Sequence, residues 1–404
     1  SCCPRNTDMQ KPVNHLENMF GRMGIHISKR AYNQLELFVN SFPGNCYGMD
    51  PEYDRFLTLS DAATCLMYKE YVQHSEDTPL KIYYTDRKGM PVAIDITGKE
   101  GKVKMTDNSN FFCLGPSGSG KSFHMNSVVR QLHEQGTDVV MVDTGNSYEG
   151  LCEYLGGKYI SYTEEKPITM NPFKITKEEV NIEKINFLKN LILQIWKGSE
   201  GIVTKTEDRL IGQAIEEYYR SYFTGKIDAP LSFNSFFDFT VVRIPEIITE
   251  NELKGIDTAD LNYQLRDFYR GGSHEATLNE NMDSTLFDET FIVFEIDAIK
   301  DDATLFPIVT LIIMDVFLQK MRLKKNRKVL VIEEAWKAIA TPLMAEYIKY
   351  LYKTARKFWA SVGVVTQEIQ DIISSEIVKE AIINNSDVVM LLDQSKFRER
   401  FDEI

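Results

Sequence analysis

The sequence lacks the cysteine and histidine patterns that staple small folds or bind zinc. Its 404 residues include six cysteines and six histidines. No two cysteines form a C-x-x-C pair, and no histidine stands at zinc-site spacing from them. Disulfide scaffolds and structural zinc sites are recognised by such spacings. The sequence therefore predicts neither, which suits a protein of the reducing cytosol.

An excess of positive charge is also absent. The chain has 46 Lys and Arg residues against 59 Asp and Glu residues, a net charge of −13. A basic footprint for nucleic acid over the whole chain is thereby excluded, although a local basic channel is not. One basic cluster is present, and we interpret it as a solvated face. Its members are Arg322, Lys324, Lys325, Arg327 and Lys328.

Long apolar runs are missing as well. The longest, Phe306–Leu318, is interrupted by Asp315 and falls short of the roughly 20 residues that a membrane-spanning helix needs. We therefore expect no intrinsic transmembrane segment. The chain opens at Ser1 with neither Met nor a signal peptide, so we expect a fragment from which an upstream portion has been removed.

The most informative segment that is present, GPSGSGKS at 115–122, fits the phosphate-loop pattern G-x-x-x-x-G-K-S/T at every fixed position. In this pattern backbone N–H groups surround the phosphates, the lysine reaches the β/γ oxygens and the hydroxyl ligates Mg²⁺. An apolar strand precedes the loop and a helical pattern follows it, which makes a chance match improbable. The sequence thus predicts ATP and Mg²⁺ as ligands, with Ser122 on the metal. The predicted nucleotide-binding residues are Gly115, Pro116, Ser117, Gly118, Ser119, Gly120, Lys121, Ser122 and Phe123, the last with its ring in the helix core rather than against a base.

Downstream of this loop, apolar strands alternate with helices, as in a mainly parallel α/β sheet flanked by helices. The expected strands are Phe111–Leu114, Val139–Asp143, Lys158–Tyr162, Phe291–Ile296, Val329–Ile332, Val362–Thr366 and Val388–Leu392. A long stretch between the third and fourth strands has helical periodicity and many charges. We therefore expect an ATPase domain at 106–173 and 286–404, and an all-α insertion at 174–285.

Residues 1–105 carry no readable chemistry, and we treat them as a partial N-terminal region. Apolar positions predict a helix over Asn14–Ser41. Two strands, Lys81–Asp86 and Val92–Ile96, flank a turn and predict a hairpin. This hairpin could be the edge of the main sheet or the remains of another domain. Because it runs almost directly into the phosphate loop, we expect it at the edge of the main sheet.

Two carboxylates, Glu333 and Glu334, follow the four apolar residues Val329–Ile332. The carboxyl ends of parallel strands form the ligand crevice of an open sheet, so this strand delivers its acids beside the phosphate loop. One acid can hold the Mg²⁺ shell, and the other can orient or deprotonate the attacking water. Charged residues also end buried strands for no catalytic reason, and only the pairing with the loop favours catalysis.

Two further groups fit a hydrolase. Gln367 ends the strand Val362–Thr366 and could sense the γ-phosphate, or it could simply be a polar strand end. Arg356 ends the preceding helix, where we expect it close to the carboxyl edge of the sheet. Either Arg356 or the neighbouring Lys357 could stabilise transition-state charge across a subunit interface, as arginine fingers do. We favour Arg356, since a guanidinium binds phosphate bidentately. Helix C-termini, however, attract basic residues for dipole reasons alone.

Taken together, these segments resemble the type IV secretion and conjugation ATPases, and most closely the TraG-type ATPases of conjugative transposons. The segments that carry the likeness are GPSGSGKS, VVMVDTGNSYEGL (139–151), MNPF (170–173), VLVIEEAW (329–336), TARKFWAS (354–361) and GVVTQ (363–367). The resemblance implies a RecA-like motor that acts as a homo-hexamer. It further implies a cytoplasmic position against the inner membrane, with other secretion components as partners.

The resemblance also assigns roles to the acids. The family commonly has Asp-Glu-Ala-Trp where this chain has Glu333-Glu334-Ala335-Trp336. Glu333 then occupies the magnesium position and Glu334 the water-activating position. Asp143 and Ser147 are implied to stand behind the site or at a subunit contact, although Ser147 could equally cap the helix beginning near Tyr148.

Two alternative functions stay open from the sequence alone. A DNA translocase or coupling protein of the FtsK/HerA type shares the motor and would touch DNA, at least transiently, through a basic loop with aromatics. A non-catalytic scaffold would bind ATP and hydrolyse little of it. The cargo, the role of residues 1–105 and the function of the insertion are not encoded in any motif that we recognise.

Overall fold

The computed structural model describes residues 10–27, 32–45, 48–49, 52, 58–60, 62–63, 75–78, 80–86, 89–96, 109–198, 201–281, 283–334, 342–367 and 382–395. The chain divides into two compact units, Ser1–Val72 and Gln73–Ile404. In the first unit the expected single helix over Asn14–Ser41 is wrong. Two helices are present instead, α1 (Gln10–Arg22) and α2 (Gln34–Asn40). Gly24, at φ +75°, ends the turn that follows α1, a conformation that glycine adopts without steric cost.

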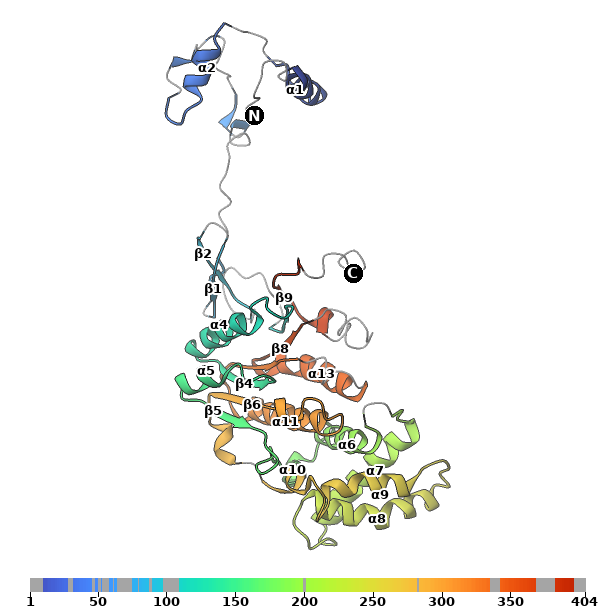
Figure 1. The fold of residues 1–404 in the computed structure, drawn as a ribbon. Coiled ribbons are helices and arrows are strands. Elements are labelled where there is room, and N and C mark those ends of the chain that lie inside the picture. The colour runs from blue at the N-terminus through green and yellow to red at the C-terminus, as the bar shows by residue number, and fades with distance from the viewer. Residues whose placement is uncertain are drawn as a thin grey trace. The chain divides into compact units, whose positions relative to one another are not determined.

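A seven-stranded sheet forms the centre of the second unit (Figure 1). Its strand order is β5-β6-β4-β7-β8-β3-β9, and all neighbouring strands run parallel. All seven strands expected from the sequence are confirmed, with ends that differ by at most two residues. They are β3 (Phe111–Leu114), β4 (Asp138–Asp143), β5 (Lys158–Ser161), β6 (Phe291–Glu295), β7 (Lys328–Ile332), β8 (Ala360–Thr366) and β9 (Val388–Leu391).

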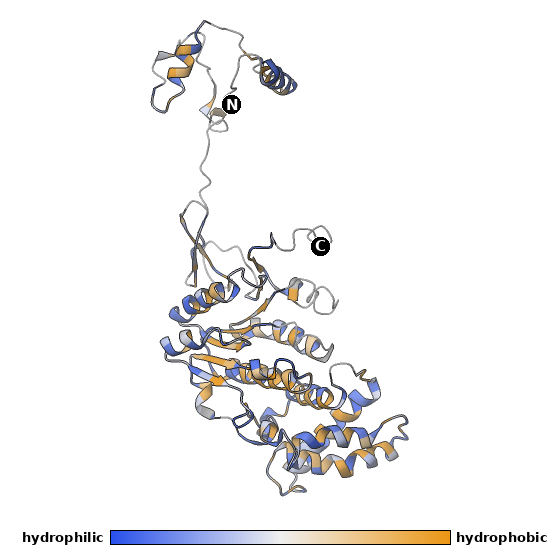
Figure 2. Ribbon diagram, in the orientation of Figure 1, coloured by the Kyte–Doolittle hydropathy of each residue, from blue (hydrophilic) through white to orange (hydrophobic). Residues whose placement is uncertain are grey.

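Helices cover both faces of the sheet because alternate strand residues face opposite sides and nearly all are apolar. In β4, Val139 and Met141 pack beneath α4 (Lys121–Glu134) and α5 (Glu149–Tyr154). Val140 and Val142 face the other core, which includes α11 (Leu305–Leu323) and α13 (Pro342–Ala355). The strands and α11 are the most hydrophobic parts of this unit (Figure 2). Even so, no helix among the described residues is long and apolar enough to cross a membrane.

Between β5 and β6 the described secondary-structure elements are all helices, joined by loops and turns. The helices are α6 (Ile182–Lys197), α7 (Lys205–Phe223), α8 (Phe233–Glu250), α9 (Thr258–Leu265) and α10 (Glu275–Asn279). Short 3₁₀ turns occur at Lys177–Glu179, Arg266–Phe268, Ser284–Phe287, Asp297–Ile299, Arg356–Phe358 (η7) and Ile383–Asn385. Residues 73–404 form one compact unit that is not divided further. The bounds expected from the sequence for an ATPase domain and an insertion therefore stay a prediction.

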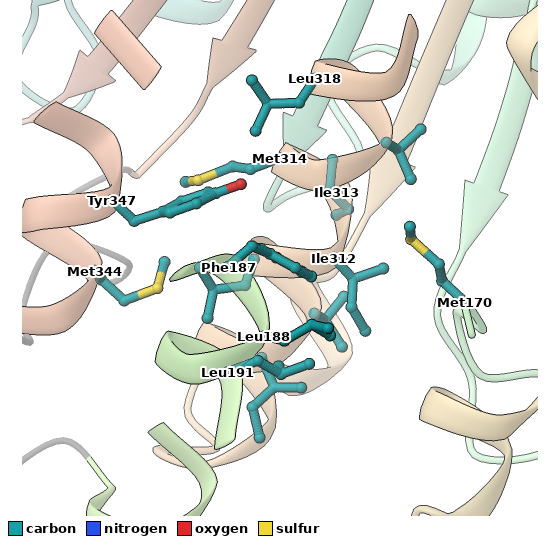
Figure 3. Packing of buried hydrophobic residues seen from close by; sticks show 14 of the residues in the cluster. Met170, Phe187, Leu188, Leu191, Ile312, Ile313, Met314, Leu318, Met344 and Tyr347 are labelled. Carbon is teal, nitrogen blue, oxygen red and sulfur yellow. The ribbon is translucent and has the colours of Figure 1, made fainter. Parts of the chain in front are cut away.

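α6 joins this helical stretch to the sheet through a shared core. Phe187, Leu188 and Leu191 of α6 pack with Ile312 and with residues of α13 (Figure 3). A buried ion pair adds to the contact, with Lys184 Nζ 2.7 Å from Asp315 Oδ2. This pair explains the acid that interrupts the apolar run of α11, since a buried charge needs a partner.

The β-hairpin exists, but its expected place in the main sheet is wrong. β1 (Ile82–Thr85) and β2 (Pro91–Ile94) pair only with each other in a separate antiparallel sheet. β9, which comes from the far end of the sequence, occupies the position beside β3. The hairpin instead contacts α4, where Tyr83 N donates to Gln131 Oε1 at 2.8 Å and the Tyr84 ring stacks on His124 at 5.7 Å.

Candidate functional site

The parallel topology brings the polar ends of five strands to one edge of the sheet. The phosphate loop follows β3, Asp143 ends β4, and Glu295 ends β6. Glu333 follows β7, and Gln367 follows β8. Segments more than 200 residues apart in sequence thus meet where open α/β sheets bind ligands.

The loop at 115–122 is tight at its base and open at its tip. Gly115 N donates to Thr366 O of β8 at 3.1 Å, and a Cβ on Gly115 would lie 2.7 Å from Ser119 Oγ and 2.9 Å from Leu392 Cδ1. Gly118 and Gly120 have φ values of +83° and +86°, which favour glycine. The loop tip is exposed, and α4 begins directly after Gly120. This arrangement presents backbone N–H groups and a helix N-terminus to an anion.

Lys121, the first residue of α4, is held by both carboxylates of the acidic strand. Its Nζ lies 2.8 Å from Glu334 Oε1 and 3.4 Å from Glu333 Oε2, and its side chain is only 9% exposed. Burial alone would lower the pKa of Lys121, but the charge of Glu333 and the hydrogen bond that Lys121 donates to Glu334 raise it. Lys121 therefore stays protonated beside the loop, and its ammonium group can bind phosphate oxygens in place of the carboxylates.

Glu334 occupies a left-handed backbone conformation, with φ +48°. Such a conformation costs a non-glycine residue about 1–3 kcal/mol and is concentrated at functional sites. In this conformation the Glu334 side chain contacts two partners. Besides Lys121, Gln367 Nε2 donates to Glu334 Oε1, at 2.6 Å. The structure thus brings Lys121, Glu334 and Gln367 together at one edge of the sheet.

Glu333 is more deeply buried than Glu334 and has a partner that the sequence did not reveal. Its side chain is 5% exposed, and the hydroxyl of the fully buried Tyr148 donates to Glu333 Oε1. Burial raises the pKa of Glu333, although Lys121 and Tyr148 act against this rise. A nearby cation would favour its charged form, which is the form that ligates Mg²⁺.

Behind these groups lies a second pair of buried acids, Asp143 and Glu295. Asp143 Oδ2 accepts the backbone N–H of Ser147 at 2.7 Å and of Tyr148 at 3.3 Å. Burial and the neighbouring Glu295 raise the pKa of Asp143 to about 8. The alternative that Ser147 caps the next helix is wrong, because α5 has Tyr148 at its N-cap position and no side-chain cap. Asp143 fixes the loop that carries Tyr148 to Glu333.

Glu295 orders the other part of this loop, and sequence reasoning missed it. Its carboxylate accepts the backbone N–H of Asn146 at 2.9 Å and of Asp297 at 2.8 Å. Tyr159 OH also donates to Glu295 Oε2, at 3.3 Å. The signal in the sequence was the same as for Glu333, an acid at the end of a buried apolar strand, but no motif singled it out.

The residues present fit Mg²⁺ better than a metal with an all-protein ligand set. Within the described ranges, no group of three or more His, Cys, Asp or Glu side chains could hold a metal ion. Mg²⁺ binds through one or two carboxylates, and substrate phosphates and water supply its other ligands. The hydroxyl of Ser122 and the carboxylate of Glu333 are hard oxygen donors of this kind.

For two residues the expected exposure to solvent is wrong. Phe123 is 84% exposed and is not part of the helix core, since it lies about 200° around the helix from the buried Met125. Lys328 is 1% exposed rather than solvated. It starts the central strand β7, and its Nζ donates to Lys324 O at 2.6 Å and Asn326 O at 2.7 Å. Burial first, and then Lys320 and Lys324, lower the pKa of Lys328 to about 8.

Arg356 is not close to the carboxyl edge of the sheet, so that expectation is also wrong. Its backbone belongs to η7, which directly precedes the amino end of β8. The amino end of β7 lies beside it, because Lys328 N donates to Trp359 O at 3.1 Å. The side chain of Arg356, together with Ala335 and Trp336, lies outside the part of the chain that the structure describes. Arg356 thus starts from the sheet edge opposite its own phosphate loop.

The sequence is similar to those of bacterial proteins that are already known. Protein TraC of Escherichia coli (strain K12) is 24% identical over 298 residues, which are 71% of this chain and 32% of TraC. The type IV secretion system protein virB4 of Bartonella henselae is 26% identical over 277 residues, 68% of this chain and 32% of virB4. The chain spans about a third of the length of these curated relatives.

The fold has a solved counterpart. The structure of VirB4 of Thermoanaerobacter pseudethanolicus superposes with a TM-score of 0.62 and 22% sequence identity, and covers 81% of this chain and 87% of that one. At this identity the likeness concerns the fold, and it supports the RecA-like arrangement expected from the sequence. A family model described as the TraG P-loop domain matches residues 81–404. This match covers most of the sequence, and the chain therefore belongs to the TraG P-loop domain family.

Proposed function

We propose that this chain hydrolyses ATP in the presence of Mg²⁺ and so energises a type IV secretion or conjugation apparatus that transfers DNA or protein. The observation that carries the proposal is the contact of Lys121 with both Glu333 and Glu334, from segments 213 residues apart. The TraG P-loop family and the similarity to a type IV secretion system protein, virB4, support the secretion context.

The residues divide the chemistry among them. Backbone N–H groups of 117–122 bind phosphate oxygens, and Lys121 exchanges Glu334 for the β/γ oxygens. Ser122 and Glu333 would hold Mg²⁺, which would supply positive charge to neutralise the transferred phosphoryl group. Glu334, released from the lysine, orients and deprotonates the attacking water, and Gln367 keeps the carboxylate in place. Tyr148 fixes the orientation of Glu333.

The cellular setting is part of the same proposal. We infer a homo-hexamer at the cytoplasmic face of the inner membrane, in contact with other components of the secretion apparatus. Transient contact with DNA distinguishes a coupling protein from a motor that moves protein, and hydrolysis measured with and without DNA separates the two.

Calorimetric titration of Mg²⁺–ATP tests the nucleotide site. Lys121→Ala removes the cation that reaches the phosphates while the sheet stays intact, so the affinity for ATP should fall by at least about tenfold. Lys205→Ala, an exposed lysine at the start of α7, is the matched control and should bind as the parent does. Equal ATP affinity in Lys121→Ala and the parent would sink the assignment of the site.

The proposed finger needs a separate test because Arg356 starts from the opposite sheet edge. We infer that in a ring Arg356 serves the nucleotide of a neighbouring subunit. Arg356→Ala and Lys121→Ala subunits should each be inactive alone, and mixed hexamers should regain partial activity. If demonstrated mixed hexamers stay inactive, Arg356 does not act in trans.

A further inference from the structure

Phe123 is an exposed aromatic side chain at the border of the phosphate loop. It follows Ser122 directly and lies in the first turn of α4. At 84% exposed it is among the most exposed large apolar side chains of the described residues. The buried stripe of α4, Met125, Val128, Val129 and Leu132, packs on the sheet without it. Packing within the chain therefore does not explain an aromatic residue at this position.

The strand order fixes the direction in which a bound nucleotide extends. The order at this end of the sheet is β7-β8-β3-β9. Glu334 follows β7 and Gln367 follows β8, so the reacting γ end lies on that side of the loop. The loop itself follows β3. The α-phosphate, ribose and base consequently extend away from Glu334, toward β9.

The first turn of α4 lies on this β9 side. His124 Nε2 is 3.3 Å from Met390 Sδ of β9. Leu392, the residue after β9, lies against Gly115 at the base of the loop, and its N donates to Leu114 O at 2.9 Å. Phe123, adjacent to His124 in the same turn, thus stands where the non-reacting end of the nucleotide emerges.

We propose that the ring of Phe123 is the platform on which the nucleobase stacks; this rests on the proposed function. Stacking on an exposed aromatic ring uses the π face that every base possesses, so it does not read the hydrogen-bonding edge. Adenine and guanine are accepted alike, and the smaller pyrimidines are bound less tightly. Selection at this site is for base size.

Calorimetric titrations of the whole chain with Mg²⁺–ATP and with inorganic tripolyphosphate test the platform. Phe123→Ala should weaken ATP by about tenfold, since base–aromatic stacking typically contributes that much per base, and should leave tripolyphosphate within about twofold. Phe123→Trp should keep ATP affinity. Tyr263→Ala is the control, because Tyr263 is an exposed aromatic residue on α9, 74% exposed, and the substitution should change the affinity for neither ligand. The preference of the parent for ATP over UTP should shrink in Phe123→Ala.

The outcomes separate the two ideas. Unchanged ATP affinity in Phe123→Ala overturns the platform while leaving the phosphate site intact. Equal weakening of ATP and tripolyphosphate also overturns it, because the side chain then supports the loop and not the base. If the parent binds neither ligand, the proposed function fails and the platform falls with it.

Discussion

Glu334→Gln should bind nucleotide more tightly and yet lose turnover. In the structure Glu334 forms an ion pair with Lys121, with Nζ 2.8 Å from Glu334 Oε1. The phosphates of ATP must displace Glu334 to bind this lysine. Both side chains are largely buried, 9% and 14% exposed, so solvent screens the pair little. ATP can bind Lys121 only when this contact breaks, so the charged carboxylate of Glu334 lowers the affinity for ATP. The amide keeps the shape and removes the charge.

The magnitude follows from that single contact. A hydrogen bond to a charged group contributes about 1.5–3 kcal/mol net. Lys121 keeps Glu333 at 3.4 Å in the variant, so we take the lower end. If breaking the contact between Lys121 and residue 334 costs about 1.5 kcal/mol less in the variant, ATP binds about tenfold more tightly. Loss of the base should lower turnover by about 10²–10⁴-fold.

Calorimetry of Mg²⁺–ATP and steady-state phosphate release measure the two effects on one preparation. Glu153→Gln, an exposed acid on α5, controls for the change in net charge and should alter neither value. Weaker ATP binding in Glu334→Gln would refute the competition between Glu334 and phosphate for Lys121. If Glu333→Gln abolishes turnover and Glu334→Gln does not, the roles of the two acids are reversed.

Three further substitutions probe what supports the site. Gly363→Ala should lower the thermal unfolding midpoint by several degrees, because its Cβ would lie 2.1 Å from the Phe111 ring and such overpacking costs about 1–3 kcal/mol. Asp143→Asn should flatten the dependence of stability on pH. With a raised pKa of about 8 the folded chain holds up to one extra proton, so wild-type stability falls by up to about 1.4 kcal/mol per pH unit from pH 5 to pH 8. Tyr148→Phe should lower turnover by about tenfold or more, as loss of a donor to buried Glu333 costs about 1–3 kcal/mol.

Each of these substitutions has a result that counts against it. Gly150→Ala on α5, where a Cβ meets nothing within 4 Å, should not destabilise; a loss equal to that of Gly363→Ala would remove the steric explanation. An unchanged pH slope in Asp143→Asn would show that Asp143 is ionised in the folded chain. Full turnover in Tyr148→Phe would mean that Glu333 needs no hydroxyl to hold it.

The sheet and the phosphate loop were predictable because their signals are local. A buried parallel strand is an apolar run with polar residues at its end, as Val329–Ile332 before Glu333 shows. The glycines of the loop are set by its backbone conformation, which leaves a fixed spacing in the sequence. Gln367 was reached by the same logic, since it ends a strand of the same kind.

Most of what sequence reasoning missed depends on long-range contacts. Tyr148 reaches Glu333 across 185 positions, and no local pattern marks that partnership. The hairpin was placed in the main sheet because it precedes β3, whereas β9 took that place through pairing with a distant segment. Lys328 was judged by its basic neighbours, but its burial is decided by its position at the start of a central strand. Phe123 was misplaced for a local reason, since its phase on the helix already pointed away from the core.

Phosphate release from Mg²⁺–ATP by the parent chain and by Lys121→Ala, followed over rising protein concentration, tests the central claim most directly. We predict release by the parent that rises more steeply than linearly as rings form, and background release by Lys121→Ala at every concentration. If the parent binds ATP and forms rings but releases no phosphate, or if Lys121→Ala releases it at the parent's rate, the chain is not an ATPase that works through this site.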